Sequence, residues 1–301
     1  MKTSKFLLAL TLILILSLTI VVWFFPPNGD FRVDNPFWNG FSTVDAKMKA
    51  TTIETFDSLP SDPVGTALVL VPYEPFSAND LNRLSSYVSN GGTLVVLDDY
   101  GYGNQVLNGV QSTMTFSGIP MLDPLYNYKN EQLPLITSFA TGPLTANISS
   151  VVLNHATCLN DTSNATVIAF SSSFSFLDVS GTGSSTGSDP NGPFPYAAYQ
   201  KLGQGYVVAL ADPSILINGM INMGNNLQFI NNVLKLNAAN PQVFIDQSHL
   251  PTTNLDVAKA DLTFVYSVIS SPIGSLSLIA VIIVLSLNSI YRKGEDHAEK
   301  R

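Results

Sequence analysis

The chain has 301 residues, 46% hydrophobic and 12% charged, with 14 Lys and Arg against 22 Asp and Glu and a single Cys. This composition excludes a disordered chain, a collagen-like chain and a small domain held together by disulfides. The mean hydropathy of +0.24 combined with few charges indicates that part of the chain lies in lipid.

The first apolar segment covers residues 6–25, follows Lys2 and Lys5, and contains no charge in 20 residues. At ~1.5 Å per residue it is long enough to cross a ~30 Å hydrocarbon core. A cleaved signal peptide has a shorter apolar region followed by small residues, whereas this segment ends in Trp-Phe-Phe-Pro-Pro. The flanks therefore favour an uncleaved signal anchor, with residues 1–5 as a short N-terminal extension.

The next region predicts a helix and two strands. Ser42 and Asp45 have the spacing of a capping box, which predicts a helix from Ser42, and a short strand follows over 51–56. Residues 66–71 are apolar after Thr66, as is typical of a strand covered on both faces.

A second helix and a further buried strand come directly afterwards. Ser77 and Asp80 predict the start of this helix, Gly91 and Gly92 its left-handed end, and 93–97 the strand. Strand, helix and strand with short joints indicate a βαβ unit and hence a parallel sheet.

The second half repeats this pattern with a strand over 205–211, a helix from about Asn225, and a strand over 243–245. Between the halves, short antiparallel strands are predicted near 114–116, 148–153 and 167–170, and a Gly-, Ser- and Pro-rich loop over 180–195. We therefore predict an α/β domain over 26–261, with a mostly parallel, doubly wound sheet flanked by helices. Whether 112–200 form a separate lobe stays open.

Residues 252–261 are a polar lead-in to a second uncharged segment, 262–291, which we predict as a second transmembrane helix that Pro272 starts or kinks. Residues 292–301 then form a tail. The positive charges at the two ends of the chain, before the first span and after the second, are Lys2, Lys5, Arg292, Lys293, Lys300 and Arg301. By the positive-inside rule both termini are cytoplasmic, and the domain lies outside a cell membrane that the chain crosses twice.

The outer domain carries 8 Lys and Arg against 19 Asp and Glu, a net charge of about −11. Phosphate backbones repel such a surface, so nucleic acid is not an expected partner. Asn147, Asn160 and Asn164 begin sequons. Their clustering is consistent with a glycosylated surface, and also with chance in an Asn- and Ser-rich chain.

Ligands of open α/β sheets bind beyond the carboxyl ends of the strands, which here are rich in acidic residues. If these ends converge, they form a candidate crevice for a ligand or a divalent cation, made by Glu74, Asp98, Asp99, Asp212, Asp246 and His249. The alternative is that the aspartates cap the helices that follow the strands, which is their commoner use.

Three other features carry weaker signals. Gly101-Tyr102-Gly103 after a strand allows a phosphate loop, but the absence of a third glycine and of a Walker lysine favours a tight strand-to-helix turn. His155 and His249 lack the spacing of a zinc site. Cys158 is expected to be a buried small residue rather than a nucleophile.

Several segments resemble an uncharacterised family of bacterial and archaeal membrane proteins, DUF 4350, related to the GldG-like component of gliding-motility ABC transporters. The segments that carry the resemblance are Asn-Gly-Phe-Ser at 39–42, Leu-Val-Leu-Val-Pro at 68–72, Ser-Asn-Gly-Gly-Thr-Leu-Val-Val-Leu-Asp at 89–98, residues 205–214 with Asn225 and Asn226 beyond, and Phe-Ile-Asp-Gln-Ser-His at 244–249. The resemblance implies an outer domain like the class I glutamine amidotransferases.

Catalytic amidotransferases carry a cysteine in a Gly-x-Cys-x-Gly elbow, whereas the corresponding turn here, 101–103, has Tyr102 and no thiol. The resemblance therefore implies a non-catalytic scaffold or binding accessory of a transport or envelope-assembly complex, with ABC-transporter or MoxR-associated partners. The alternative is a cation-dependent hydrolase or ligand-sensing domain that uses the acidic crevice. A purely structural surface protein is the third hypothesis.

Overall fold

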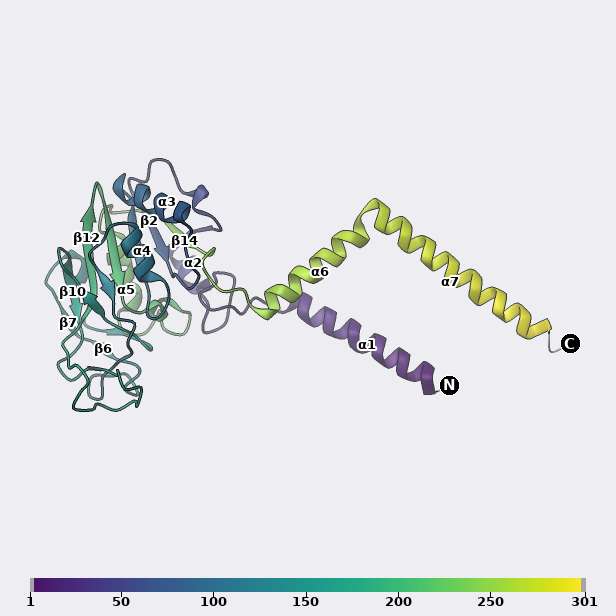
Figure 1. Ribbon diagram of the computed structural model, residues 1–301, viewed down its shortest axis with the longest axis horizontal. Coiled ribbons are helices and arrows are strands. Elements are labelled where there is room, and N and C mark those ends of the chain that lie inside the picture. The colour runs from purple at the N-terminus through teal and green to yellow at the C-terminus, as the bar shows by residue number, and fades with distance from the viewer. Residues whose placement is uncertain (1–2, 299–301) are drawn as a thin grey trace. The chain divides into compact units, whose positions relative to one another are not determined.

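The computed structural model describes residues 3–298, with side chains described through Asn288 (Figure 1). Lys2, Lys300 and Arg301, which the topology prediction uses, lie outside the described residues. The chain divides into two compact units, one formed by residues 26–251 and the other by the two terminal segments.

An eight-stranded sheet forms the centre of the 26–251 unit, in the order β1-β14-β2-β3-β13-β12-β10-β7 (Figure 1). The strands are β1 Thr51–Ile53, β14 Gln242–Asp246, β2 Thr66–Leu70, β3 Thr93–Leu97, β13 Gly205–Leu210, β12 Pro195–Leu202, β10 Thr166–Phe170 and β7 Ser138–Phe139. The first five are mutually parallel and the last three are added antiparallel. The mixed α/β class and the parallel part of the sheet follow the sequence prediction.

The parallel strands form where the sequence has uninterrupted apolar runs. All five residues of β2 and all five of β3 are buried, as expected for strands covered on both faces. The predicted strand over 51–56 is shorter than expected, because the chain turns after Ile53 into the 3₁₀ helix η1, Phe56–Ser58.

The helices of this unit are α2 Ser42–Met48, α3 Ala78–Ser89, α4 Gly103–Gly109 and α5 Asn226–Leu234, with further 3₁₀ turns η2 Pro143–Thr145 and η3 Pro213–Leu216. The predicted capping box of α3 is confirmed: Ser77 Oγ accepts from the Asp80 amide at 3.2 Å, and the Asp80 carboxylate accepts from the Ser77 amide at 3.1 Å. The capping box predicted at Ser42 is wrong. Phe41 is the N-cap residue, and the Ser42 hydroxyl lies 3.3 Å from Asn218 Oδ1 instead.

Three small antiparallel sheets are built from the region between the halves. They pair β4 Thr115–Phe116 with β9 Leu159–Asp161, β5 Met121–Leu122 with β11 Phe176–Leu177, and β6 Leu135–Ile136 with β8 Val151–Val152. Their buried side chains, such as Met121 and Val151, belong to the same continuous core as Leu97 and Ile230. Residues 112–200 therefore share one core with the large sheet.

The terminal segments form three helices, α1 Thr3–Phe24, α6 Asn254–Ser270 and α7 Pro272–Ala298. Among the described residues, α1 alone is long and apolar enough to cross a membrane by itself. The single helix predicted over 262–291 is divided: α6 and α7 meet at 77° and satisfy the same criteria only as a pair. Ser271, extended at ψ 152° as residues before proline prefer, ends α6, and Pro272 starts α7. The polar lead-in at 252–261 forms the first turns of α6, capped by Thr253.

Candidate functional site

The predicted acidic residues lie at the carboxyl edge of the parallel strands, but in two groups. Asp98, Asp99 and Asp212 follow β3 and β13, which are neighbours in the sheet, and interact electrostatically with one another. Asp246, at the end of β14, pairs with His249. Glu74 is exposed on the segment after β2. The structure thus brings three of the six predicted side chains together in one group and two in another.

Asp98 is 2% exposed and serves the turn that follows β3. Its carboxylate accepts the amides of Gly101 and Gly103, each at 2.8 Å. A Cβ atom at Gly103 would lie 2.5 Å from Asp98 Oδ2, so the glycine permits this close approach. Burial raises the pKa of Asp98 to about 6, against the effect of the two amides. The glycines therefore form the tight strand-to-helix turn, with Asp98 as its internal partner.

Asp99 points to the segment after β2. Its carboxylate accepts the Tyr73 hydroxyl at 2.5 Å and the Tyr100 amide at 2.6 Å. The ring of Tyr73 stacks on Phe31 with centroids 5.3 Å apart. Burial raises the pKa of Asp99 above its ordinary value, and burial together with the charge of Asp99 raises that of Tyr73. This pair links a buried carboxylate to an aromatic side chain at the edge of the domain.

Asp212 is fully buried and caps η3 by accepting the Ser214 amide at 2.7 Å. Its other oxygen accepts the Asn154 amide, also at 2.7 Å. Burial raises the pKa of Asp212 well above its ordinary value, and the charge of Asp99 adds to this. The capping role predicted as the alternative use of the aspartates is thus present at Asp98 and Asp212.

Asp246 and His249 form a closed polar cluster at the end of β14. His249 Nδ1 lies 2.9 Å from Asp246 Oδ2, and the Ser248 hydroxyl donates to Asp246 Oδ1 at 2.6 Å. The imidazole is stacked between Phe56 and Phe76, with centroids 5.0 and 3.8 Å away. The cluster joins the ends of β14 and β2, since the carbonyl of His249 also accepts the amides of Tyr73 and Glu74 in the segment after β2.

A cavity of about 300 Å³ lies beyond the carboxyl ends of β2 and β13. Aromatic and polar side chains both line it, among them Asp30, Phe31, Trp38, Tyr73, His155 and Ser214. His155 has φ of 55°, the left-handed region that favours glycine, and its carbonyl accepts the Tyr100 hydroxyl at 2.7 Å. Sequence reasoning missed Phe31 and Trp38, which carry no motif and come from the irregular segment before α2. It placed the segment 212–214 at the sheet edge without singling out Ser214, which lies in η3.

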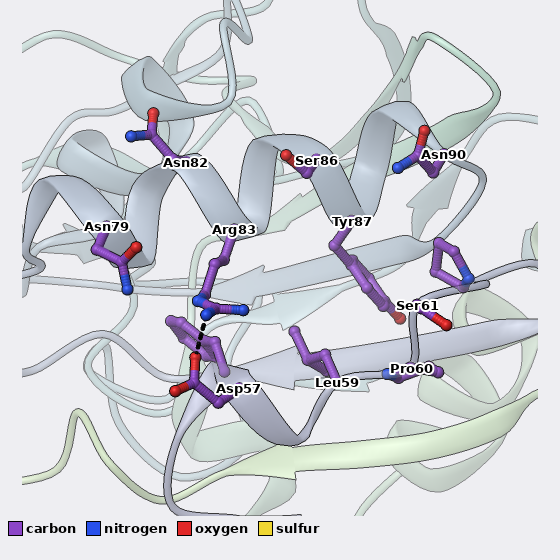
Figure 2. Close-up of a pocket in the computed structure, with 12 residues that line it drawn as sticks. Asp57, Leu59, Pro60, Ser61, Asn79, Asn82, Arg83, Ser86, Tyr87 and Asn90 are labelled. Atoms are coloured by element: carbon purple, nitrogen blue, oxygen red, sulfur yellow. Dashed lines mark ion pairs between the residues drawn. The ribbon is translucent and has the colours of Figure 1, made fainter.

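A second, more open cavity of about 450 Å³ lies along α3. Figure 2 shows a row of polar side chains from this helix above it, with Arg83 reaching down to Asp57. Arg83 Nη2 and Asp57 Oδ1 are 2.5 Å apart, and both side chains are largely exposed. This cavity holds none of the predicted site residues.

The remaining predictions concern a metal site, the single cysteine and the sequons. Within residues 3–298, no three His, Cys, Asp or Glu side chains are grouped so as to hold a metal ion. Cys158 is 2% exposed, and burial raises the pKa of its thiol to about 11. Asn147, Asn160 and Asn164 are all exposed.

The fold and the cavity together define an α/β domain with a partly parallel sheet and a candidate ligand site at its carboxyl edge. The chain belongs to the family described as Domain of unknown function (DUF4350), which matches residues 33–234. No protein with a curated description matches the sequence.

Two solved structures are similar to this chain at low sequence identity. The structure titled mmIFT52 N-terminal domain is 14% identical with a TM-score of 0.50, covering 64% of this chain and 88% of that one. A putative thua-like protein from Bacteroides uniformis is 14% identical with a TM-score of 0.38, covering 63% of this chain and 78% of that one. The first likeness concerns the fold alone.

Proposed function

We propose that the protein is a membrane-anchored binding module, non-catalytic and resembling an amidotransferase domain, whose α/β domain lies outside the membrane. It acts as an accessory subunit of a transport or envelope-assembly complex and binds its ligand or partner in the carboxyl-edge cavity. The cavity carries this proposal, because it lies where open α/β sheets bind ligands and combines aromatic and polar walls.

Two features of the chain support the anchoring. α1 has 22 residues, is apolar, and has no buried residue. Both segments that lead from the terminal helices into the domain line the cavity, the first through Phe31 and Trp38 and the second through Pro251. The first is fastened to the sheet by Gln247, whose Oε1 accepts the Val33 amide at 2.9 Å. A ligand in the cavity therefore contacts the segments that join the domain to its anchors.

The non-catalytic part of the proposal rests on the residues at the elbow and on the cysteine. Tyr102 stands between the glycines of the turn before α4 and is the N-cap residue of that helix. Cys158 lies on another segment, buried, with a thiol pKa raised to about 11, so little thiolate forms at neutral pH. The thiol chemistry of a glutamine amidotransferase has no support in this arrangement.

The alternative function was either a cation-dependent hydrolase or a ligand-sensing domain. Of these two, we retain ligand sensing. Asp98 and Asp212 are turned toward backbone amides, and the Tyr73 hydroxyl occupies one oxygen of Asp99. Because of these contacts, Asp98, Asp99 and Asp212 lie behind the cavity wall and act on the site electrostatically.

The test is co-purification of the full-length protein from its native membrane in mild detergent, followed by mass spectrometry. Ser214→Phe fills the carboxyl-edge cavity, and Ser86→Phe, in the cavity of Figure 2, is the matched control. We expect a stoichiometric partner or ligand with wild type and Ser86→Phe that Ser214→Phe loses. Equal recovery with both variants, or isolation of a bare monomer in every case, contradicts the proposal.

The outer location has its own test. Asn164 is exposed and Cys158 is buried, so Asn164→Cys places one accessible thiol on the domain. A membrane-impermeant maleimide applied to intact cells is expected to label this variant and to leave wild type unlabelled. Labelling that requires lysis contradicts the outer location.

A further inference from the structure

We infer that the carboxyl-edge cavity binds a small organic cation, with an ammonium or quaternary ammonium group held against the aromatic wall in front of the buried Asp99. This inference rests on the proposed function and names the ligand class of that site. It is carried by the aromatic rings that line the cavity, by Asp30 in its lining, and by the Asp99 carboxylate behind Tyr73.

The aromatic wall has the form that attracts a cation. Phe31 and Tyr73 stack at 11° to each other, and Trp38 also lines the cavity although it is 69% exposed. The faces of aromatic rings carry partial negative charge, and sites for quaternary ammonium groups are commonly built from several such faces. Because Phe31 and Tyr73 each cover one face of the other, the stack leaves one outer face of each ring, and Trp38 adds a further aromatic side chain to the lining.

The lining of the cavity favours positive charge in a ligand. Among the described residues that line it, Asp30 is the acidic side chain, and no Lys or Arg is present. Directly behind the wall, Asp99 accepts the Tyr73 hydroxyl. The domain as a whole carries about −11, so a cation is attracted and an anion is repelled.

The acidic group behind the wall is held mainly by neutral donors. The hydrogen bonds of Asp98, Asp99 and Asp212 come from backbone amides, from the Tyr73 hydroxyl and from Ser214. Among the described residues, the ion pairs join Arg32 to Asp34, Arg83 to Asp57, and His249 to Asp246 and Asp80, and a positive charge on His155 lowers the pKa of Asp99.

The chain contains its own reporter for this binding. Its two tryptophans are Trp23, in α1, and Trp38, at the cavity, so Trp23→Phe leaves Trp38 as the single source of tryptophan emission. The full-length Trp23→Phe protein, in a maltoside detergent, is titrated with choline and with 3,3-dimethylbutan-1-ol, which has the same shape without the charge. Putrescine tests a primary ammonium group in the same way.

We expect choline or putrescine to change the Trp38 emission with saturation in the micromolar to millimolar range, and the neutral alcohol to bind about tenfold more weakly or not at all. Asp99→Asn, made in the same background, is expected to weaken cation binding about tenfold. Asp30→Asn is a second variant at an exposed position, in case the buried substitution impairs folding, and is expected to weaken it about threefold. Asp57→Asn, at the other cavity, is the matched control.

Two sources of the cation are distinguished by the lipid. In nanodiscs of phosphatidylglycerol, free choline is expected to bind as in detergent. If the natural source is a lipid headgroup, nanodiscs containing phosphatidylcholine shift the emission and compete with choline. A free cation as the source leaves the titration the same in both lipids.

Equal binding of choline and the neutral alcohol overturns the inference and leaves the cavity as a binding site for neutral ligands. Saturable binding by neither cation also overturns it. The co-purification experiment with Ser214→Phe is independent of these titrations. Failure of the proposed function is therefore seen there, and failure of the ligand class is seen here.

Discussion

The two acidic groups at the carboxyl edge of the sheet are built from the same residue type and differ in how their charge is balanced. Asp246 is enclosed by His249 and Ser248, and the imidazole lies between two phenylalanine rings. Asp98, Asp99 and Asp212 are bonded to amides and a tyrosine hydroxyl, and adjoin a cavity. The first group is complete and joins strand ends, whereas the second lies behind the wall of a cavity open to ligands.

This difference shows why acidic residues at strand ends do not by themselves indicate one function. In both groups each carboxylate organises local backbone, as helix and turn capping requires. The second group lies behind the carboxyl-edge cavity, whose lining includes Tyr73, the hydrogen-bond partner of Asp99. The experiments below separate structural from binding roles, from the largest expected effect to the smallest.

Asp246→Ala should have the largest effect on stability. It removes the carboxylate that faces His249 and leaves buried donors without a partner, so we expect a loss of ~3–5 kcal/mol in the free energy of unfolding. Chemical denaturation of the full-length protein measures it. A loss below ~1 kcal/mol would show that the closed cluster does not hold the strand ends together.

In the second group, Asp98 should make the free energy of unfolding depend on pH. Its pKa in the folded domain, about 6, lies above the ordinary 3.8, so the folded state binds this proton more tightly than the unfolded chain. The contribution to stability is therefore fully present below about pH 3.8 and is lost as the pH rises through about 6.

Comparison with Asp98→Asn isolates this effect. At ~1.4 kcal/mol per pH unit, the difference between the two pKa values amounts to ~3 kcal/mol. We expect the wild type to lose up to this amount relative to Asp98→Asn between pH 4 and 7, measured by denaturation at each pH. Parallel pH profiles for the two proteins would contradict the raised pKa.

Tyr73→Phe should have an intermediate effect. The substitution keeps the stack on Phe31 and removes the hydrogen bond to Asp99, so we expect a loss of ~1.5–3 kcal/mol, typical of a bond to a charged group. Tyr128→Phe, at an exposed tyrosine, is the control and should be close to neutral. If both substitutions are neutral, the Tyr73 hydroxyl does not hold Asp99 in solution.

Arg83→Ala should have the smallest effect. Its ion pair with Asp57 is short, but both partners are largely exposed, and such pairs contribute ~0–1 kcal/mol. Thermal denaturation in low and high salt measures this contribution. A larger loss that salt does not reduce would give the second cavity a structural importance that its exposure does not suggest.

The parallel half of the domain could be predicted from the sequence because each strand is an uninterrupted apolar run next to a recognisable helix start. β2 and β3 are buried throughout, and Ser77 and Asp80 form the predicted capping box between them. The antiparallel half could be predicted only as short strands in approximate places. Pairs such as Met121–Leu122 with Phe176–Leu177 are two residues long and leave little periodicity to detect.

The candidate site was predicted in part, for a similar reason. The carboxylates could be placed at the sheet edge because they directly follow the strands. Their division into two groups depends on strand order, since β2 lies between β14 and β3 and therefore separates Asp246 from Asp98. The aromatic wall could not be found, because Phe31 and Trp38 come from an irregular segment whose aromatic residues follow neither the helix period nor the strand period.

The most direct test of the binding function is photo-crosslinking in the native membrane. A benzophenone amino acid is placed at position 38, at the carboxyl-edge cavity, and separately at position 86 on α3. The account predicts a discrete adduct, identified by mass spectrometry, from position 38 and none from position 86. Adducts of equal yield at both positions, or none at position 38, would contradict the claim that this cavity is where the domain binds.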